Sequence, residues 1–180
     1  MVKIPLTFSD VAEIVGSDTM SLLTLTDAAR ENQLTIVCDR AVAQQLGLRA
    51  RGMPAARLLL PEVMGTVARQ WGGLQLELII VGLDNGVYKT LLMNTDTMDV
   101  MPIRASDAVL LSVAAGIPLY IEEHLMKRQS VPYQGGGPGI NIPVNTLSLD
   151  MLENALAKAV DEVNYETASK LRDEIERRRK

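Results

Sequence analysis

Alternating apolar and polar positions divide the first part of the chain into short strands. The runs with β character cover residues 2–8, 20–26, 33–38, 74–80, 87–93, 98–103 and 118–121. Asp84-Asn85-Gly86 separates the fourth run from the fifth, and an Asn-Gly pair supplies the positive φ angles that a tight hairpin turn requires. The pattern therefore predicts a hairpin at this turn.

Four other segments of the same region have helical spacing. They cover residues 40–47, 56–71, 106–116 and 122–128. Asp39 is the expected N-cap of the first helix and Gly47 its expected C-cap, while Gly72-Gly73 should end the second. Residues 106–116 are almost all apolar, so we expect this helix to be buried.

A change of composition follows residue 129. Residues 130–143 carry no charge and are rich in Gly and Pro, which is typical of a linker. Beyond them, apolar residues at helical spacing predict two helices, with Asn164 as the N-cap of the second and Glu166 in its first turn.

These elements predict an α+β fold, in which helices pack on a mixed or antiparallel sheet and a C-terminal α-helical hairpin follows. We expect a sheet domain at 1–128, a Gly/Pro-rich linker at 129–146 and the hairpin at 147–180.

Charge and composition exclude several functions. The net charge of −4 argues against a protein that binds nucleic acid through an overall positive field, so any polyanion site must be local. The nearest arginines to a cluster are Arg40, Arg49, Arg51 and Arg57. His124 is the only histidine, which excludes zinc sites and catalytic centres that need two imidazoles. Cys38, the only cysteine, is expected to be a buried and inert thiol within a strand. No run approaches the ~20 apolar residues of a membrane span, and we expect a cytoplasmic protein.

The beginning of the predicted helix 106–116 is one candidate site. Ser106 and Asp107 can stabilise the helix as N-cap and as a negative charge near the positive end of the dipole. Alternatively, Arg104 beside a helix N-terminus forms a pocket for a phosphate group. Both interpretations stay open for Arg104, whereas capping is the simpler role for Ser106.

A second candidate is the acidic pair Glu122-Glu123. With Asp107 or Asp84, these carboxylates have the chemistry to hold Mg²⁺ or Mn²⁺ and to activate a water for attack on a phosphodiester. The most specific metal pair that the sequence suggests is Asp107 with Glu122. Adjacent glutamates at the start of a helix are also ordinary solvated residues, which is the simpler interpretation.

A resemblance to a known family rests on two strings of this region. Arg104-Ala105-Ser106-Asp107-Ala108, followed by Gly116-Ile117-Pro118 and then Glu122-Glu123, resembles the hallmark of the bifunctional nuclease domain family. The resemblance spans roughly residues 1–128. It implies a compact α+β fold and cleavage of both DNA and RNA, with Arg104, Ser106, Asp107, Glu122 and Glu123 as the candidate catalytic residues.

Two departures from this family accompany the resemblance. Leu60-Pro61-Glu62 stands where many members have Thr-His-Asp, and Pro102 stands where they often have an acidic residue. The intact hallmark thus favours an enzyme, while the missing residues and the acidic composition favour a protein without catalysis.

The C-terminal segment is similar to the UvrB/UvrC (UVR) motif. The string Tyr165-Glu166-x-Ala168-x-x-Leu171-Arg172-Asp173 carries this likeness. In that family the hairpin binds a copy of itself or another protein, so the resemblance implies tethering through residues 147–180.

Two functions therefore remain for the whole chain. The first is a metal-assisted nuclease that acts on DNA or RNA and carries a UVR interaction motif. The second is a non-catalytic regulatory or adaptor protein whose hairpin recruits a partner protein. In either case we expect a homo-oligomer, because the sheet domain has few aromatic residues and the hairpin exposes apolar positions.

Overall fold

The alternating runs of the sequence form one mixed sheet, which has eight strands in the described part of the chain. The computed structural model describes residues 2–14, 19–133, 147, 149–161 and 163–179. The strands are β1 (Lys3–Glu13), β2 (Met20–Asp27), β3 (Asn32–Asp39), β4 (Leu76–Asp84), β5 (Val87–Asn94), β6 (Val100–Arg104), β7 (Leu119–Glu122) and β8 (Val131–Pro132). Their order in the sheet is β6-β5-β4-β7-β1-β2-β3-β8. The predicted fold class is confirmed.

The strand pairing follows from turns in the chain. β1, β2 and β3 pair as an antiparallel meander, and β4 and β5 lie next to each other in the sheet. Asn85 and Gly86 between them have φ values of 50° and 80°, the conformation that an Asn-Gly hairpin turn requires. β7 pairs in parallel with β4 and antiparallel with β1, which makes the sheet mixed.

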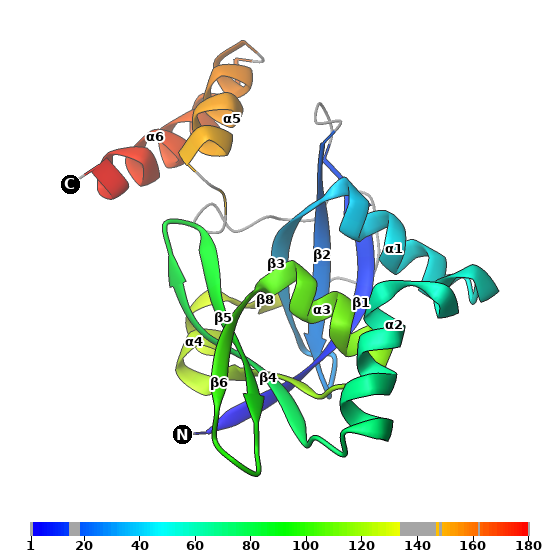
Figure 1. Cartoon of the computed structure of the whole chain (residues 1–180). Coiled ribbons are helices and arrows are strands. Elements are labelled where there is room, and N and C mark those ends of the chain that lie inside the picture. The colour runs from blue at the N-terminus through cyan, green and yellow to red at the C-terminus, as the bar shows by residue number, and fades with distance from the viewer. Residues whose placement is uncertain (1, 15–18, 134–146, 148, 162, 180) are drawn as a thin grey trace. The chain divides into compact units, whose positions relative to one another are not determined.

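Helices cover both sides of this sheet. They are α1 (Arg40–Ala50), the 3₁₀ helix η1 (Pro54–Leu58), α2 (Leu60–Gly65), the π-helical turn η2 (Thr66–Trp71), α3 (Ala105–Ala115) and α4 (Glu123–Gln129). In Figure 1, α1, α2 and α3 lie in front of the sheet and α4 lies behind it. Helix α3 contacts α1, α2 and strands β3, β6 and β7, so it is the centre of the front layer.

The burial of α3 confirms the expectation drawn from its apolar sequence. Six of its residues are buried, among them Ala108 and Val109 with no exposed surface. Gly116 ends the helix at a φ of 65°, and Arg69 Nη1 donates to the carbonyl oxygens of Ala115 and Gly116 at 2.6 and 3.0 Å. These bonds satisfy carbonyl groups that the end of a helix leaves without partners.

Two details of the predicted helices are wrong. Helix α1 continues through Gly47 to Ala50, and its C-cap is Arg51. The single helix expected over 56–71 is instead three short segments, η1, α2 and η2. Pro61 explains one of the breaks, because a proline is favoured only in the first turn of a helix and α2 begins at Leu60.

A layer of aliphatic side chains between the sheet and the front helices forms the core. The large side chains with almost no exposed surface are Leu23, Leu25, Leu34, Leu46, Leu78, Ile80, Val109, Ile117 and Ile121. Cys38 is buried with them, as expected.

The predicted linker 129–146 is described only at its beginning. Val131 and Pro132 form β8, which pairs with Asn32 and Gln33 of β3, so these two residues belong to the sheet. Residues 134–146 of the predicted linker lie outside the described residues.

The chain divides into two compact units, and the C-terminal helices belong to the second. They are α5 (Leu149–Asp161) and α6 (Tyr165–Arg179), and they form the predicted hairpin. Asn164 Oδ1 accepts a hydrogen bond from the Thr167 amide at 3.2 Å, which confirms the predicted cap. Leu152 and Leu171 are buried between the helices, while Val160, Val163 and Tyr165 are more than half exposed. None of the described helices is long and apolar enough to cross a membrane.

Candidate functional site

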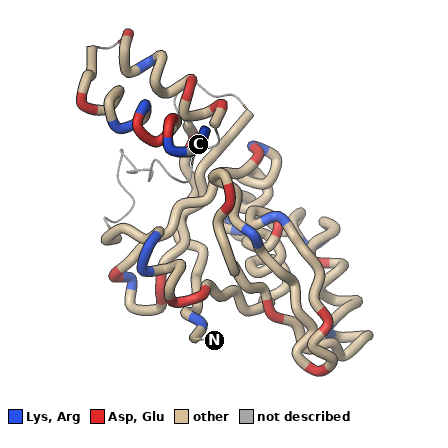
Figure 2. Tube along the Cα trace, turned by 90° about the vertical axis from the view of Figure 1, so that its left-hand side faces the viewer, with Lys and Arg blue, Asp and Glu red and all other residues tan. Residues whose placement is uncertain are grey.

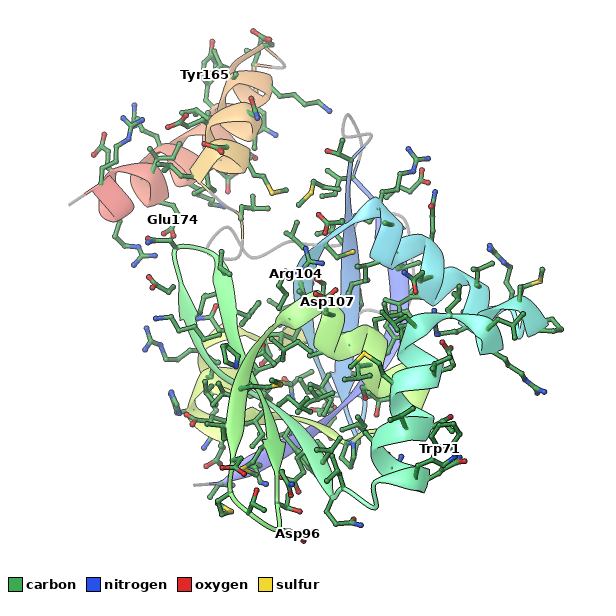
Figure 3. The ribbon with its side chains drawn as sticks, in the orientation of Figure 1. Trp71, Asp96, Arg104, Asp107, Tyr165 and Glu174 are labelled. Atoms are coloured by element: carbon green, nitrogen blue, oxygen red, sulfur yellow. The ribbon has the colours of Figure 1, made fainter. Side chains whose placement is uncertain are left out.

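A guanidinium held by two carboxylates lies where β6 meets α3. Arg104 donates from Nε and Nη2 to the two oxygens of Asp107, at 2.6 and 3.0 Å, and from Nη1 to Asp39 Oδ2 at 2.8 Å. Figure 3 shows the labelled Arg104 and Asp107 side by side at the beginning of α3. We call these three residues the Asp39–Arg104–Asp107 cluster.

Each residue of the cluster is placed by an element of the sheet domain. Arg104 is the last residue of β6 and the N-cap of α3, and Asp39 is the last residue of β3 and the N-cap of α1. Asp107 is in the first turn of α3, one helical turn from Arg104. The cluster therefore joins two strand-to-helix junctions.

The cluster is open to solvent on one side. The side chains of Arg104, Asp39 and Asp107 are 64%, 48% and 34% exposed. The bonds to Asp107, and then the bond to Asp39, raise the pKa of Arg104 further above its usual value, so the guanidinium stays charged. Nη1 and Nη2 each carry a second N–H that none of these three bonds uses. The arrangement thus offers oriented N–H donors beside two carboxylates.

The predicted role of Ser106 as N-cap is wrong. The N-cap residue is Arg104, no side chain caps α3, and Ser106 is a buried residue of the first turn. The predicted negative charge in this turn is present, because Asp107 lies there. Of the predicted catalytic residues, the structure brings together Arg104, Ser106 and Asp107.

Glu122 and Glu123 lie apart from this group. Side chains alternate along a strand, so Glu122 lies on the same side of β7 as Tyr120, opposite the buried Leu119 and Ile121. Helix α3 lies in front of the sheet, on the buried side. Glu122 Oε2 is 3.1 Å from His124 Nδ1, and Glu123 Oε1 accepts a bond from Lys127 at 2.7 Å.

The residues proposed for a metal do not fit together. Asp107 and Glu122 are on opposite sides of the sheet, so they do not face one ion. Within the described ranges, no group of three or more His, Cys, Asp or Glu side chains is arranged to hold a metal ion. Asp107 and Glu122 therefore do not form the predicted site for Mg²⁺ or Mn²⁺.

The four arginines nearest to a cluster in the sequence do not all contribute to one basic surface. The Arg49 side chain is only 7% exposed, and it donates to both oxygens of Glu62 at 2.7 and 2.6 Å. Arg40 lies 3.9 Å from Glu13. Figure 2 shows Lys and Arg interspersed with Asp and Glu along the chain. Arg104 is thus the best supported arginine for contact with a phosphate.

Sequence reasoning missed Asp39 as a member of the site. It identified this residue only as a helix cap, and the carboxylate makes no capping bond and binds Arg104 instead. The two residues are 65 positions apart, so no local pattern indicates the contact.

Comparison with known families gives two matches. The family model described as "Bifunctional nuclease domain" matches residues 23–134. The model described as "UvrB/uvrC motif" matches residues 148–180. A search of curated proteins finds no match to the chain.

Proposed function

We propose, from the premise that the chain belongs to the bifunctional nuclease domain family, that it cleaves DNA or RNA at the Asp39–Arg104–Asp107 cluster. The UvrB/uvrC motif of the C-terminal hairpin would bring a protein partner to this activity. The proposed setting is the bacterial cytoplasm.

The observation that supports this proposal is that two carboxylates hold the Arg104 guanidinium in one orientation. A guanidinium that is fixed by carboxylates on two elements loses little further freedom when it binds a phosphate. Its second N–H groups on Nη1 and Nη2 suit two oxygens of one phosphodiester. Such donors stabilise the negative charge that grows on the phosphoryl oxygens during cleavage.

The carboxylates supply the second chemical group that hydrolysis needs. When water attacks the phosphorus, a new P–O bond forms and the water loses a proton. The bond to the leaving oxygen breaks, and that oxygen keeps the electron pair and takes a proton from solvent. Asp107 or Asp39 would accept the proton that the water loses. Both are partly exposed, so a water molecule has access to either.

The test is a cleavage assay with labelled single- and double-stranded DNA and RNA, with and without Mg²⁺ or Mn²⁺. Wild type is compared with Arg104→Ala and Asp107→Ala. Arg177→Ala is the matched control, because it removes an arginine that is also paired to a carboxylate, Glu174, but lies on the hairpin. The proposal requires cleavage by wild type and by Arg177→Ala, and its loss in both cluster variants.

One observation favours the second function, a non-catalytic regulatory or adaptor protein. The cluster has two carboxylates and one guanidinium, so it carries an excess negative charge that opposes the approach of a polyanion. In this case the sheet domain supplies a binding or oligomerising surface. The hairpin recruits a partner through the exposed Val160, Val163 and Tyr165.

The same assay separates the two functions. If the folded protein, shown to unfold cooperatively, cleaves none of the substrates with either metal, the nuclease is rejected and the adaptor function is supported. Partner recruitment is then measured directly, as loss of binding of an isolated candidate partner in Tyr165→Ala.

A further inference from the structure

An apolar stripe faces solvent along α2 and η2. Leu60, Val63, Met64, Val67 and Trp71 follow each other at helical spacing, and their exposed fractions are 68%, 48%, 51%, 45% and 78%. Figure 3 shows the labelled Trp71 pointing away from the helix into solvent. A surface helix of a monomeric protein normally turns such a stripe toward the core.

The one buried residue of α2 and η2 is Gly65. A Cβ added to Gly65 would come within 2.3 Å of Ala115 Cβ, so α2 packs against α3 almost backbone to backbone. This close packing leaves the larger apolar side chains on the outer side. The segment is therefore oriented with its apolar stripe outward.

A groove adjoins the stripe. A cavity of about 300 Å³ lies between α2, η2 and the strands β5 and β6, and most of its lining is apolar. Met64 belongs to both the stripe and the groove, and Leu74, Val100 and Met101 form exposed parts of the groove wall. We call these eight residues, five on the stripe and three on the groove, the apolar face.

The area of this face matches that of a dimer interface. From their exposed fractions, the eight residues expose on the order of 800 Å² per copy, close to the ~800 Å² per partner of a standard interface. The largest apolar patch of a typical monomer is only ~300–600 Å².

The shape and the charges of the face suit an identical copy. A ridge lies beside a groove, so a two-fold axis through the face would place the ridge of each copy against the groove of the other. Arg57 and Arg69 line a neighbouring pocket on the helix side, and Asp99 belongs to the groove on the strand side. A rotation of 180° about that axis places the arginines of one copy on the side of the acidic residue of the other copy.

Two polar side chains of the helix side are already bonded within one copy. Glu62 of α2 is bonded to Arg49 through both oxygens, and Arg69 donates to two carbonyl groups. We propose that two copies of this chain pair through the apolar face about a two-fold axis.

The test is the mass of the full chain in solution by light scattering coupled to gel filtration. Wild type is expected at twice the 19.6 kDa of one chain. Val67→Asp places a carboxylate in the middle of the stripe and should raise the dissociation constant about 100-fold or more, because that charge would be buried without a partner. Its thermal unfolding should stay cooperative, since Val67 is exposed within one copy. Met101→Asp, on β6, provides a second variant if Val67→Asp unfolds.

Two controls carry the same change on other exposed valines. Val2→Asp at the beginning of the chain and Val163→Asp on the hairpin replace residues that are 64% and 62% exposed. Both should stay dimeric. The proposal is overturned if the wild type is a monomer. It is also overturned if Val163→Asp dissociates the dimer while Val67→Asp and Met101→Asp leave it intact. Because these readouts do not involve cleavage, they are independent of the proposed nuclease.

Discussion

Asp39 Oδ2 accepts a hydrogen bond of 2.8 Å from Arg104 Nη1, although the strands that end in these residues, β3 and β6, are separated by five others in the sheet. The two distant strand ends meet at the front layer of helices because the sheet curls (Figure 1). The contact links the ends of a curled sheet and orients the candidate catalytic arginine.

Asp39→Ala should lower the activity, because it removes a contact that orients Arg104, while it leaves the stability of the fold almost unchanged. The pair is largely exposed, so the free energy of unfolding should fall by no more than about 1 kcal/mol. If the proposed nuclease is correct, kcat should fall by on the order of 10- to 100-fold because Arg104 loses one of its two anchors. KM should not rise, since removal of a negative charge does not repel a polyanion. Glu13→Ala, which removes the exposed partner of Arg40, is the control and should leave kcat unchanged. An unaltered kcat in Asp39→Ala would argue against a positioning role.

Gly65→Ala should destabilise the sheet domain. Its Cβ would lie 2.3 Å from Ala115 Cβ and 3.1 Å from Ala115 Cα, so α2 must move away from α3, at a cost of about 1–3 kcal/mol. In the matched change Gly47→Ala, the new Cβ meets only the Arg51 side chain, at 3.8 Å. Because Gly47 is inside α1, this variant should gain about 0.5–1 kcal/mol. Urea unfolding of both variants measures the difference, and equal stabilities would contradict the close packing.

Glu62→Ala should be among the most destabilising single changes on the surface of the domain. Arg49 has a side chain only 7% exposed and would keep its charge without the two bonds from Glu62. Breaking a fully buried pair costs about 3–5 kcal/mol; the Arg49–Glu62 pair is only partly buried, so the expected loss is about 2–3 kcal/mol. Glu166→Ala removes the exposed partner of Lys170 and should have almost no effect on the stability measured by thermal unfolding. Comparable melting temperatures for the two variants would show that the Arg49 pair is not structurally important.

The pH dependence of stability should reveal the burial of Cys38. Burial, with a smaller contribution from Asp39, raises the pKa of this thiol from 9.0 to about 11. Above pH 9 the unfolded chain releases the proton while the folded chain retains it. Stability is therefore complete below pH 9 and is lost as the pH rises toward 11. Denaturant unfolding from pH 8 to 11 should show a steeper fall for wild type than for Cys38→Ala. Parallel curves would contradict a protonated thiol in the folded state.

The sequence predicted most of what depends on neighbouring residues. The Asn85-Gly86 turn, the buried helix α3 and the Asn164 cap each follow from a pattern a few residues long. The ion pair between Arg104 and Asp107 also lies within one helical turn, although it was not predicted from the sequence. Alternation and helical spacing are local properties of the backbone, so a single sequence carries them.

Tertiary structure alone decided which distant residues share a site and which side of a segment is exposed. Asp39 reaches Arg104 only because the whole sheet curls, and Glu122 is separated from Asp107 because the two lie on opposite sides of it. The stripe from Leu60 to Trp71 has the spacing of a core-facing helix, yet the contact between Gly65 and Ala115 turns it outward. Spacing defines an apolar stripe, whereas the packing of small residues against a neighbouring helix decides its direction.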